Sequence, residues 1–212
     1  MMSQIVEIDK AFIEDSVRKL DRADVEISEI PDMQFYMEQL TEFLNKKAGG
    51  AKRADTTDNQ SDVFTKAMIN NYTKNGVLNP PDKKKYNREH ILLLLIINQL
   101  KNILTMKDIK TLFEPVLKNM SGIEVDDNII SLEDIYTTFL KLKDDEYKNA
   151  ATDFDKKFSI IKEKTSKISD EKNQDLAEAF LIVMMLVAEA NIAKRLAESI
   201  IDNLPSITQR KN

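Results

Sequence analysis

The most informative absences are those of residues that cross-link chains, ligate metals or break helices. Among 212 residues there is no cysteine and no tryptophan, one histidine, four glycines and five prolines. Without cysteine, the chain has no disulfides, thiolate metal sites or thiol nucleophiles. The single histidine, His90, argues against a multi-histidine metal site and a histidine-based catalytic relay. Because helix breakers are scarce while Leu, Ile, Lys, Glu and Asp are abundant, the composition predicts an all-α fold.

Long apolar segments are also absent. The N-terminal stretch MMSQIVEIDKAFIEDSV is acidic and has no apolar run typical of a signal peptide. The longest apolar runs, ILLLLII at 91–97 and AFLIVMMLVA at 179–188, are shorter than the about 20 residues that span a bilayer. We therefore expect a cytoplasmic protein without a membrane partner.

Motifs for catalysis are missing too. The sequence has no glycine-rich phosphate loop and no nucleophile elbow. The acidic segment DDNIISLED at 126–134 lacks the mid-loop glycine of a calcium-binding EF-hand. We expect no enzymatic activity, no catalytic residues, no metal and no cofactor.

Positive charge is concentrated in one region of an acidic chain. The net charge is −5, yet residues 64–110 contain nine basic and three acidic residues, a net charge of +6. A local positive field suits an anionic partner. Charge alone equally fits a solvated loop that contains several lysines.

The N-terminal part of the chain, to Gly76, predicts three helices with polar connections. Helix 8–21 has an apolar side, and a second helix, 33–47, is expected to be capped by Asp32. The GG-containing segment 48–62 is expected to be a loop. Thr65 should cap a polar helix at 66–75, which Gly76 ends in the left-handed conformation. The apolar faces of the first two helices comprise Phe12, Ile13, Val17 and Leu20, and then Phe35, Tyr36, Leu40, Phe43 and Leu44.

The centre of the chain combines an extended turn with a buried helix. Pro80 and Pro81 exclude a helix from VLNPPDKKKY at 77–86, which predicts two short extended pieces around a turn. Asn87 should cap helix 88–104, whose apolar side chains on every side predict a buried core helix. Thr105 should cap a short helix that Pro115 ends or kinks.

The second half predicts long helices. After a break at 120–130, Ser131 and Asp134 have capping-box spacing, and apolar residues then recur to about residue 164, in one long helix or two stacked helices. A last helix is expected from about 174 to 203. Its apolar middle, FLIVMMLV, should be covered on several sides. One face of this helix is expected to comprise Phe180, Met184, Val187, Asn191 and Leu196.

The order of these elements predicts a winged helix-turn-helix followed by a helical bundle or coiled coil. Helix 66–75 would enter the major groove of duplex DNA, and the lysine-rich segment 79–86 would be a wing along the phosphate backbone. Asparagine amides can bind the adenine edge, and lysines can neutralise phosphates. The tyrosines could equally pack their rings in the core. The expected DNA-binding residues are Thr65, Lys66, Asn70, Asn71, Tyr72, Lys74, Lys83, Lys84, Lys85, Tyr86 and Arg88.

The segment INNYTKNGVL…KKKYNREHI resembles the MerR family, in which a helix that ends in RYY…GLL is followed by a wing. By this resemblance Asn70 occupies the place of the family's arginine, and Tyr86 that of its wing tyrosine. The later LTMKDIKTLF is similar to the family's GFSLEEIKELL. The shortened wing and the long 46–62 loop depart from the MerR pattern.

A closer resemblance is to a MerR-like bacterial family, domain-of-unknown-function family eighteen-thirty-six. It rests on FYMEQLTEFL and on FTKAMINNYTKNGVLNPPDKKKYNREHILLLL, and it covers about residues 30–115. The resemblance implies a DNA-binding domain and supplies no target or ligand.

Three regions are therefore expected: an N-terminal helical extension at 1–30, a MerR-like winged helix-turn-helix at 31–119, and helices at 120–212. The last region is expected to form a homodimer, because a long apolar stripe requires a partner surface. An effector pocket lined by Phe180, Met184 and Met185 is the alternative for this region. The predicted function is a DNA-binding transcription regulator. The alternative is an interaction module whose helix-turn-helix binds a protein.

Overall fold

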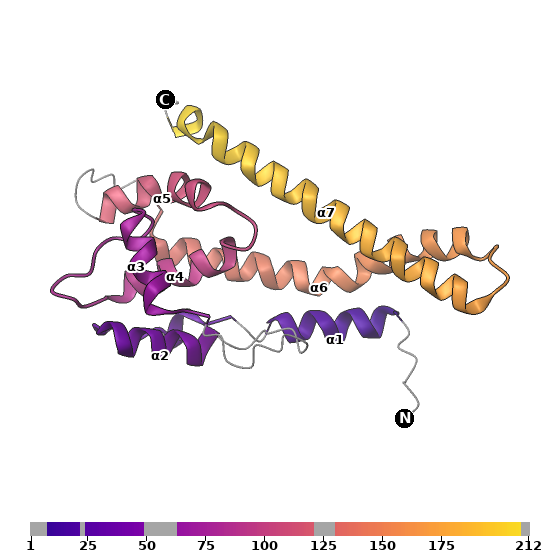
Figure 1. The fold of residues 1–212 in the computed structure, drawn as a ribbon, viewed down its shortest axis with the longest axis horizontal. Coiled ribbons are helices and arrows are strands. Elements are labelled where there is room, and N and C mark those ends of the chain that lie inside the picture. Colours follow the sequence, from indigo (N-terminus) through magenta and orange to yellow (C-terminus); the bar gives the residue numbers. More distant parts are fainter. Residues whose placement is uncertain (1–7, 22–23, 49–62, 121–129, 209–212) are drawn as a thin grey trace. The chain divides into compact units, whose positions relative to one another are not determined.

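The computed structural model describes residues 8–21, 24–48, 63–120 and 130–208 (Figure 1). This part of the chain contains seven α-helices and one short 3-10 helix, and no β-strand. The all-α prediction is therefore confirmed. The expected loop at 48–62 and the expected break at 120–130 lie almost entirely outside the described residues, which omit 49–62 and 121–129.

The chain divides into two compact units. One comprises residues 22–141 and 197–212, and the other comprises residues 1–21 and 142–196. This division differs from the three predicted regions. The first helix belongs with the C-terminal helices, because its apolar side packs on them rather than on the helices that follow it.

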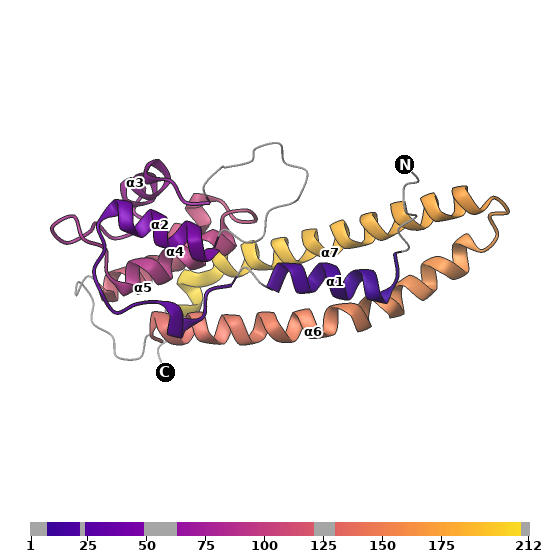
Figure 2. The ribbon, with the colours of Figure 1, turned by 90° about the horizontal axis from the view of Figure 1, so that it is seen from below.

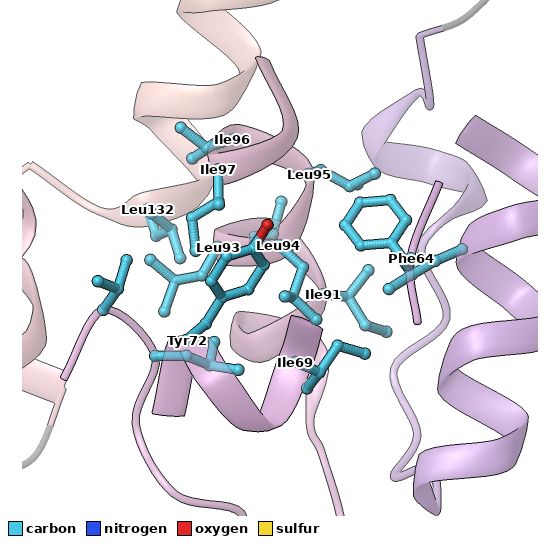
Figure 3. Close-up of a cluster of buried hydrophobic side chains, with 14 of the residues drawn as sticks. Phe64, Ile69, Tyr72, Ile91, Leu93, Leu94, Leu95, Ile96, Ile97 and Leu132 are labelled. Carbon is cyan, nitrogen blue, oxygen red and sulfur yellow. The ribbon is translucent and has the colours of Figure 1, made fainter. Parts of the chain in front are cut away.

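The 22–141 unit is built around one helix, α4 (Arg88–Leu100). Every side chain from Ile91 to Ile97 is buried, as predicted for a helix that is apolar on all sides. Figure 3 shows Phe64 and two side chains of α3 (Lys66–Lys74), Ile69 and Tyr72, converging on it. The other elements of this unit are η1 (Ile27–Glu29), α2 (Met37–Ala48), α5 (Met106–Met120), the first turns of α6 (Leu132–Thr165) and the end of α7 (Glu171–Thr208) from residue 197.

The predicted start of α2 is wrong. The helix begins at Met37 rather than near residue 33, so Asp32 is not its cap. Phe35 instead pairs with Tyr86, and the two residues exchange backbone hydrogen bonds of 2.8 Å each way. The Tyr36 amide donates to Oε1 of Gln39 at 3.0 Å, and this bond caps the helix. Tyr36 was expected on the apolar face but is exposed.

Pro115 was expected to end or kink α5, and an end at this residue is wrong, because the helix continues through this proline to Met120. Proline removes one backbone donor and does not by itself stop a helix whose apolar side chains bury well. Ile109, Phe113 and Leu117 follow the helical repeat and are all buried, which holds the segment on both sides of Pro115 against the core.

The second unit combines α1 (Lys10–Asp21) with residues 142–165 of α6 and residues 171–196 of α7 (Glu171–Thr208) (Figure 2). Its core is small: Phe154, Phe158 and Ile182 are buried, and Ile13 of α1 packs against them. Ser131 caps α6 as its sequence predicted, since the Asp134 amide donates to Oγ of Ser131 at 3.1 Å, and this hydroxyl donates to Oδ2 of Asp134 at 2.7 Å. The helix that follows is one long helix rather than two stacked helices.

Helix α7 is much less covered than predicted. Within FLIVMMLV only Ile182 is buried, and Met185 is half-buried. The predicted apolar face also needs correction: Leu196 lies 16 residues after Phe180, which is about 160° around a helix, so it does not share that face. By length and composition α7 is the one described helix able to cross a membrane, a property also met by core helices of soluble proteins. Sequence reasoning did not identify this property of α7, because it counted only the uninterrupted apolar run at 179–188 and not the mean hydropathy of a longer window.

Candidate nucleic-acid interface

The polar helix α3 is fixed at both ends as its sequence predicts. Oγ1 of Thr65 accepts a hydrogen bond from the Met68 amide at 3.2 Å and caps the N-terminus. Gly76 follows the helix with φ +69°, a left-handed conformation that glycine adopts without a steric penalty. Ile69 and Tyr72 anchor one side of α3 in the core. The opposite side therefore faces solvent in a fixed orientation.

The solvent-facing side of α3 carries amides and cations. Lys66, Asn70, Asn71 and Lys74 are all exposed. Oδ1 of Asn71 accepts a hydrogen bond from Nδ2 of Asn75 at 2.9 Å, so its acceptor is already engaged. Asn70 makes no side-chain hydrogen bond within the described residues, which leaves both its donor and its acceptor for a ligand.

Lys66 is held by a carboxylate on the neighbouring helix. Its Nζ lies 2.6 Å from Oε1 of Glu38, and this hydrogen bond holds the pKa of Glu38 below its ordinary value. The pair is exposed, so water and salt weaken it. A phosphate that binds Lys66 would compete with Glu38 for the same ammonium group.

After α3 the chain forms a hairpin with a two-residue turn. Asp82 pairs with Lys85 across the turn, and the Lys85 amide donates to the Asp82 carbonyl at 2.8 Å. Lys83 and Lys84 are the two turn residues, with φ of +46° and +66°. Positive φ at both positions defines the type I′ turn, which favours Asn-Gly. Two exposed lysines therefore occupy a conformation that their Cβ atoms disfavour.

The base of the hairpin is attached to the core. Tyr86 is buried and pairs with Phe35, and Nζ of Lys85 lies 5.6 Å from the centre of the exposed Tyr36 ring. This distance is that of a cation–π contact. The attachment places the Lys83–Lys84 turn at the far end of the hairpin, away from the buried Tyr86. We call Lys66, Asn70, Asn71, Lys74, Lys83, Lys84 and Lys85 the α3–hairpin surface.

Three expected DNA-binding residues are not available for that role. Tyr72 is only 4% exposed, and Figure 3 shows its ring pointing into the core; burial raises its pKa. Tyr86 is buried as well. Nη2 of Arg88 donates to the Ile27 carbonyl at 3.0 Å, its Nη1 to the Ile30 carbonyl, and its Nε to Glu133 at 2.5 Å. Arg88 therefore joins α4 to η1 and α6.

His90 lies where the hairpin base meets the start of α4. The Asn87 amide donates to Nδ1 of His90 at 3.2 Å, and the His90 amide donates to Oδ1 of Asn87 at 3.2 Å. The ring meets Tyr86 edge-on with centroids 5.4 Å apart. Nε2 is buried and, within the described residues, unpartnered. Burial lowers the pKa of His90, against the smaller opposing effects of the Pro80 and Asn79 carbonyls.

Sequence reasoning missed two residues beside the α3–hairpin surface. Nζ of Lys110, on α5, lies 3.4 Å from the position that a Cβ at Gly76 would occupy, next to the carbonyl end of α3. A cation is favoured at that end of a helix. Tyr36, expected in the core, is exposed beside Lys85. The helical spacing of exposed Lys107 and Lys110 was the available signal for the first, whereas nothing local distinguished Tyr36 from Phe35.

The α3–hairpin surface is defined by the chemistry of its side chains. It offers cations and amide groups, which recognise phosphates and base edges. Among the described residues no three His, Cys, Asp or Glu side chains are grouped as a metal site would require.

The fold and the surface define a class: an all-helical protein with an exposed amide-bearing helix followed by a lysine-tipped hairpin. Residues 25–139, which are 115 of the 212 residues, match the family described as Domain of unknown function (DUF1836). The chain belongs to this family, and the match includes the whole α3–hairpin surface. No curated protein and no solved structure matches the chain.

Proposed function

We propose that this chain is a cytoplasmic transcription regulator that binds duplex DNA through the α3–hairpin surface. In this proposal α2, α3, the hairpin and α4 form a MerR-like winged helix-turn-helix. Helix α3 enters the major groove with Asn70 toward the base edges, and the hairpin is the wing along the phosphates. The order of the elements and the exposure of Asn70 and Lys74 support this assignment.

The observation that carries the proposal is the Lys83–Lys84 turn. Each residue with a Cβ costs roughly 1–2 kcal/mol in the left-handed region, and Asn-Gly would form the same turn at lower cost. Strained backbone positions cluster at functional sites. Two lysines with positive φ lie exposed at the tip of the hairpin. Folding of the turn does not explain them, because other residues form it at lower cost, whereas a need for positive charge at this place does.

The Lys83→Asn/Lys84→Gly variant distinguishes the effect of the two lysine charges on binding from any effect on the folding of the turn. It supplies the preferred turn residues while it removes two positive charges, so thermal stability should be equal or higher. Affinity should fall about equally for a duplex from the chain's own upstream region and for an unrelated duplex of equal length. The slope of log affinity against log salt should decrease by about 2, one unit for each lost phosphate contact.

A matched control removes equal charge elsewhere. Lys141→Gln/Lys167→Gln has the same net charge, and both lysines are exposed on the surface outside the family match. It should leave the salt slope unchanged. Equal slopes for wild type and the turn variant, or no duplex binding by wild type at low salt, would reject DNA as the partner. Either result would leave the interaction with a protein as the alternative function.

A further inference from the structure

The face of α7 that points away from α6 is apolar and exposed. Phe180 is 65% exposed, Val183 59% and Val187 54%, and Leu176 is exposed to a similar degree. Their spacing of four, three and four residues is the heptad pattern of a helix–helix seam. Ala190 continues the same spacing. We call Leu176, Phe180, Val183, Val187 and Ala190 the outer seam.

A second seam, on the opposite side of α7, packs against α6. Glu178, Ile182, Met185 and Glu189 also follow spacings of four, three and four. Ile182 is buried on Phe154 and Phe158 of α6. Oε1 of Glu178 accepts from Oγ1 of Thr165 at 2.7 Å, and Oε1 of Glu189 lies 2.6 Å from Nζ of Lys157. Helix α7 thus has two opposed seams, and within the described unit only the inner one has a partner.

The residues on either side of the outer seam are also suited to a close helix–helix contact. Its neighbours are Ala177, Ala179, Met184 and Leu186, which are small or apolar. Between residues 176 and 193 the only charged side chains are Glu178 and Glu189, and both belong to the inner seam. A contiguous apolar patch of this kind marks an interaction site.

We propose that the outer seam binds the outer seam of a second copy of this chain, with the two α7 helices antiparallel. This proposal goes beyond DNA binding and does not depend on it. A bilayer is the competing apolar partner for α7, but it would have to accept two glutamates within the apolar stretch. A carboxylate in the apolar part of a bilayer-spanning helix is strongly unfavourable. Insertion of α7 into a bilayer would also either break the ion pair between Glu189 and Lys157 or bring both charged groups into the lipid.

Charge and size both favour the antiparallel arrangement. The N-terminal end of the seam, residues 171–176, carries Glu171, Lys172 and Asp175, a net charge of −1, and the C-terminal end that faces it, residues 194–199, carries Lys194, Arg195 and Glu198, a net charge of +1. Antiparallel helices place these opposite charges side by side, whereas parallel helices place each end beside its like-charged copy. With the two-fold axis near residue 185, Phe180 faces Ala190 of the second copy, and large and small side chains then alternate across the seam.

The first test is the oligomeric state of the full chain by analytical ultracentrifugation at micromolar concentration. Wild type should be a dimer, and Val183→Asp should be a folded monomer, because residue 183 is exposed within one copy. Ala188→Asp adds the same charge at an exposed position off the outer seam and should remain a dimer. Circular dichroism confirms that each variant is helical. A monomeric wild type, or two variants that behave alike, would overturn the proposal.

The second test fixes the direction of the helices and exploits the absence of native cysteine. In the antiparallel pair, residue 183 faces residue 187 of the second copy, while each residue is about 6 Å along the axis from its own counterpart. Val183→Cys mixed with Val187→Cys should therefore form disulfide-linked heterodimers under mild oxidation, and each variant alone should not. Cross-linking of each variant alone indicates parallel helices and contradicts the proposal.

The third test addresses the bilayer directly. Wild type should remain in the supernatant when it is sedimented with vesicles of neutral and anionic phospholipids. Co-sedimentation that Val183→Asp abolishes and Ala188→Asp retains would assign the outer seam to lipid and overturn the dimer. None of these readouts involves DNA, so a failed dimer and a failed DNA site can be told apart.

Discussion

At the scale of residues, the two asparagines of α3 differ in what they can still bind. Asn71 shares its side-chain oxygen with Asn75, whereas Asn70 is exposed without such a bond. We predict that Asn70→Ala lowers the preference for one base pair by about 1–3 kcal/mol, the worth of one bidentate contact. Asn71→Ala should have the smaller effect. Competition binding with single-base operator variants measures both.

Two outcomes would contradict this prediction. If both asparagine variants keep the wild-type order of affinities across the operator variants, α3 does not read bases. If Asn71→Ala alone relaxes the preference, the bond to Asn75 must open when DNA binds. Circular dichroism controls for the fold, since both side chains face solvent and neither packs in the core.

His90 should make stability depend on pH. Burial lowers its pKa in the folded chain, so the folded state favours the neutral ring more than the unfolded state does. Stability from this residue is then complete above the unfolded pKa of about 6.5 and is lost as the pH falls below it toward the folded value. We predict that wild type loses more unfolding free energy between about pH 7.5 and pH 5.5 than His90→Gln does.

Urea denaturation at both pH values measures the difference. Glutamine keeps an acceptor that can reach the Asn87 amide but has no proton to gain, so effects of carboxylates common to both proteins cancel in the comparison. Each unit of pKa shift corresponds to about 1.4 kcal/mol. Identical pH dependence in the two proteins would show that the ring is not desolvated in solution.

At the scale of elements, α4 should determine the stability of the 22–141 unit. Leu94 is 0% exposed in the centre of the cluster in Figure 3, so Leu94→Ala removes buried surface and leaves a cavity. We predict a loss of about 2–5 kcal/mol in the free energy of unfolding. Ile103→Ala, at a residue that is 50% exposed, should cost less than about 1 kcal/mol. Chemical denaturation compares them, and equal losses would mean that α4 is not the core.

Local signals predicted the elements well. Thr65, Asn87 and Ser131 all cap the helices that their sequences indicated, because a cap depends on contacts within a few residues. Long-range contacts explain the errors. Helix α2 starts late because Phe35 pairs with Tyr86, which is 51 residues further along the chain, and no local pattern encodes that pairing.

The same limit applies to the candidate site. The exposed asparagines and lysines of α3 followed from its helical spacing, and the lysine-rich turn followed from the two prolines before it. Arg88, by contrast, was expected at DNA because it is basic and adjoins the hairpin. Its guanidinium instead binds carbonyls of Ile27 and Ile30, which lie about 60 residues earlier in the chain.

At the scale of the whole molecule, the two proposals predict a coupling. A dimer presents two α3 helices, and two half-sites about one DNA turn apart bind a dimer far more tightly than a monomer. We predict that Val183→Asp weakens binding to the full operator by at least about tenfold and leaves binding to an isolated half-site unchanged. Fluorescence anisotropy with both duplexes measures this.

Ala188→Asp, the off-seam control, should bind both duplexes like wild type. A dimeric wild type whose affinity for the operator survives Val183→Asp would mean that dimerisation serves a purpose other than DNA selectivity. Equal weakening on both duplexes would instead indicate that the added carboxylate acts through the charge of the chain, which is already −5.

The Lys83–Lys84 turn also has a consequence for how the sequence should evolve among homologous proteins. Mutation toward Asn-Gly at these positions relieves backbone strain, so drift alone should replace the lysines in any lineage where selection no longer maintains their charge. A homologous gene that encodes Asn-Gly at the two positions should therefore specify a protein that still folds but no longer holds a polyanion. The pair of codons then serves as a genomic marker of whether the ancestral activity persists.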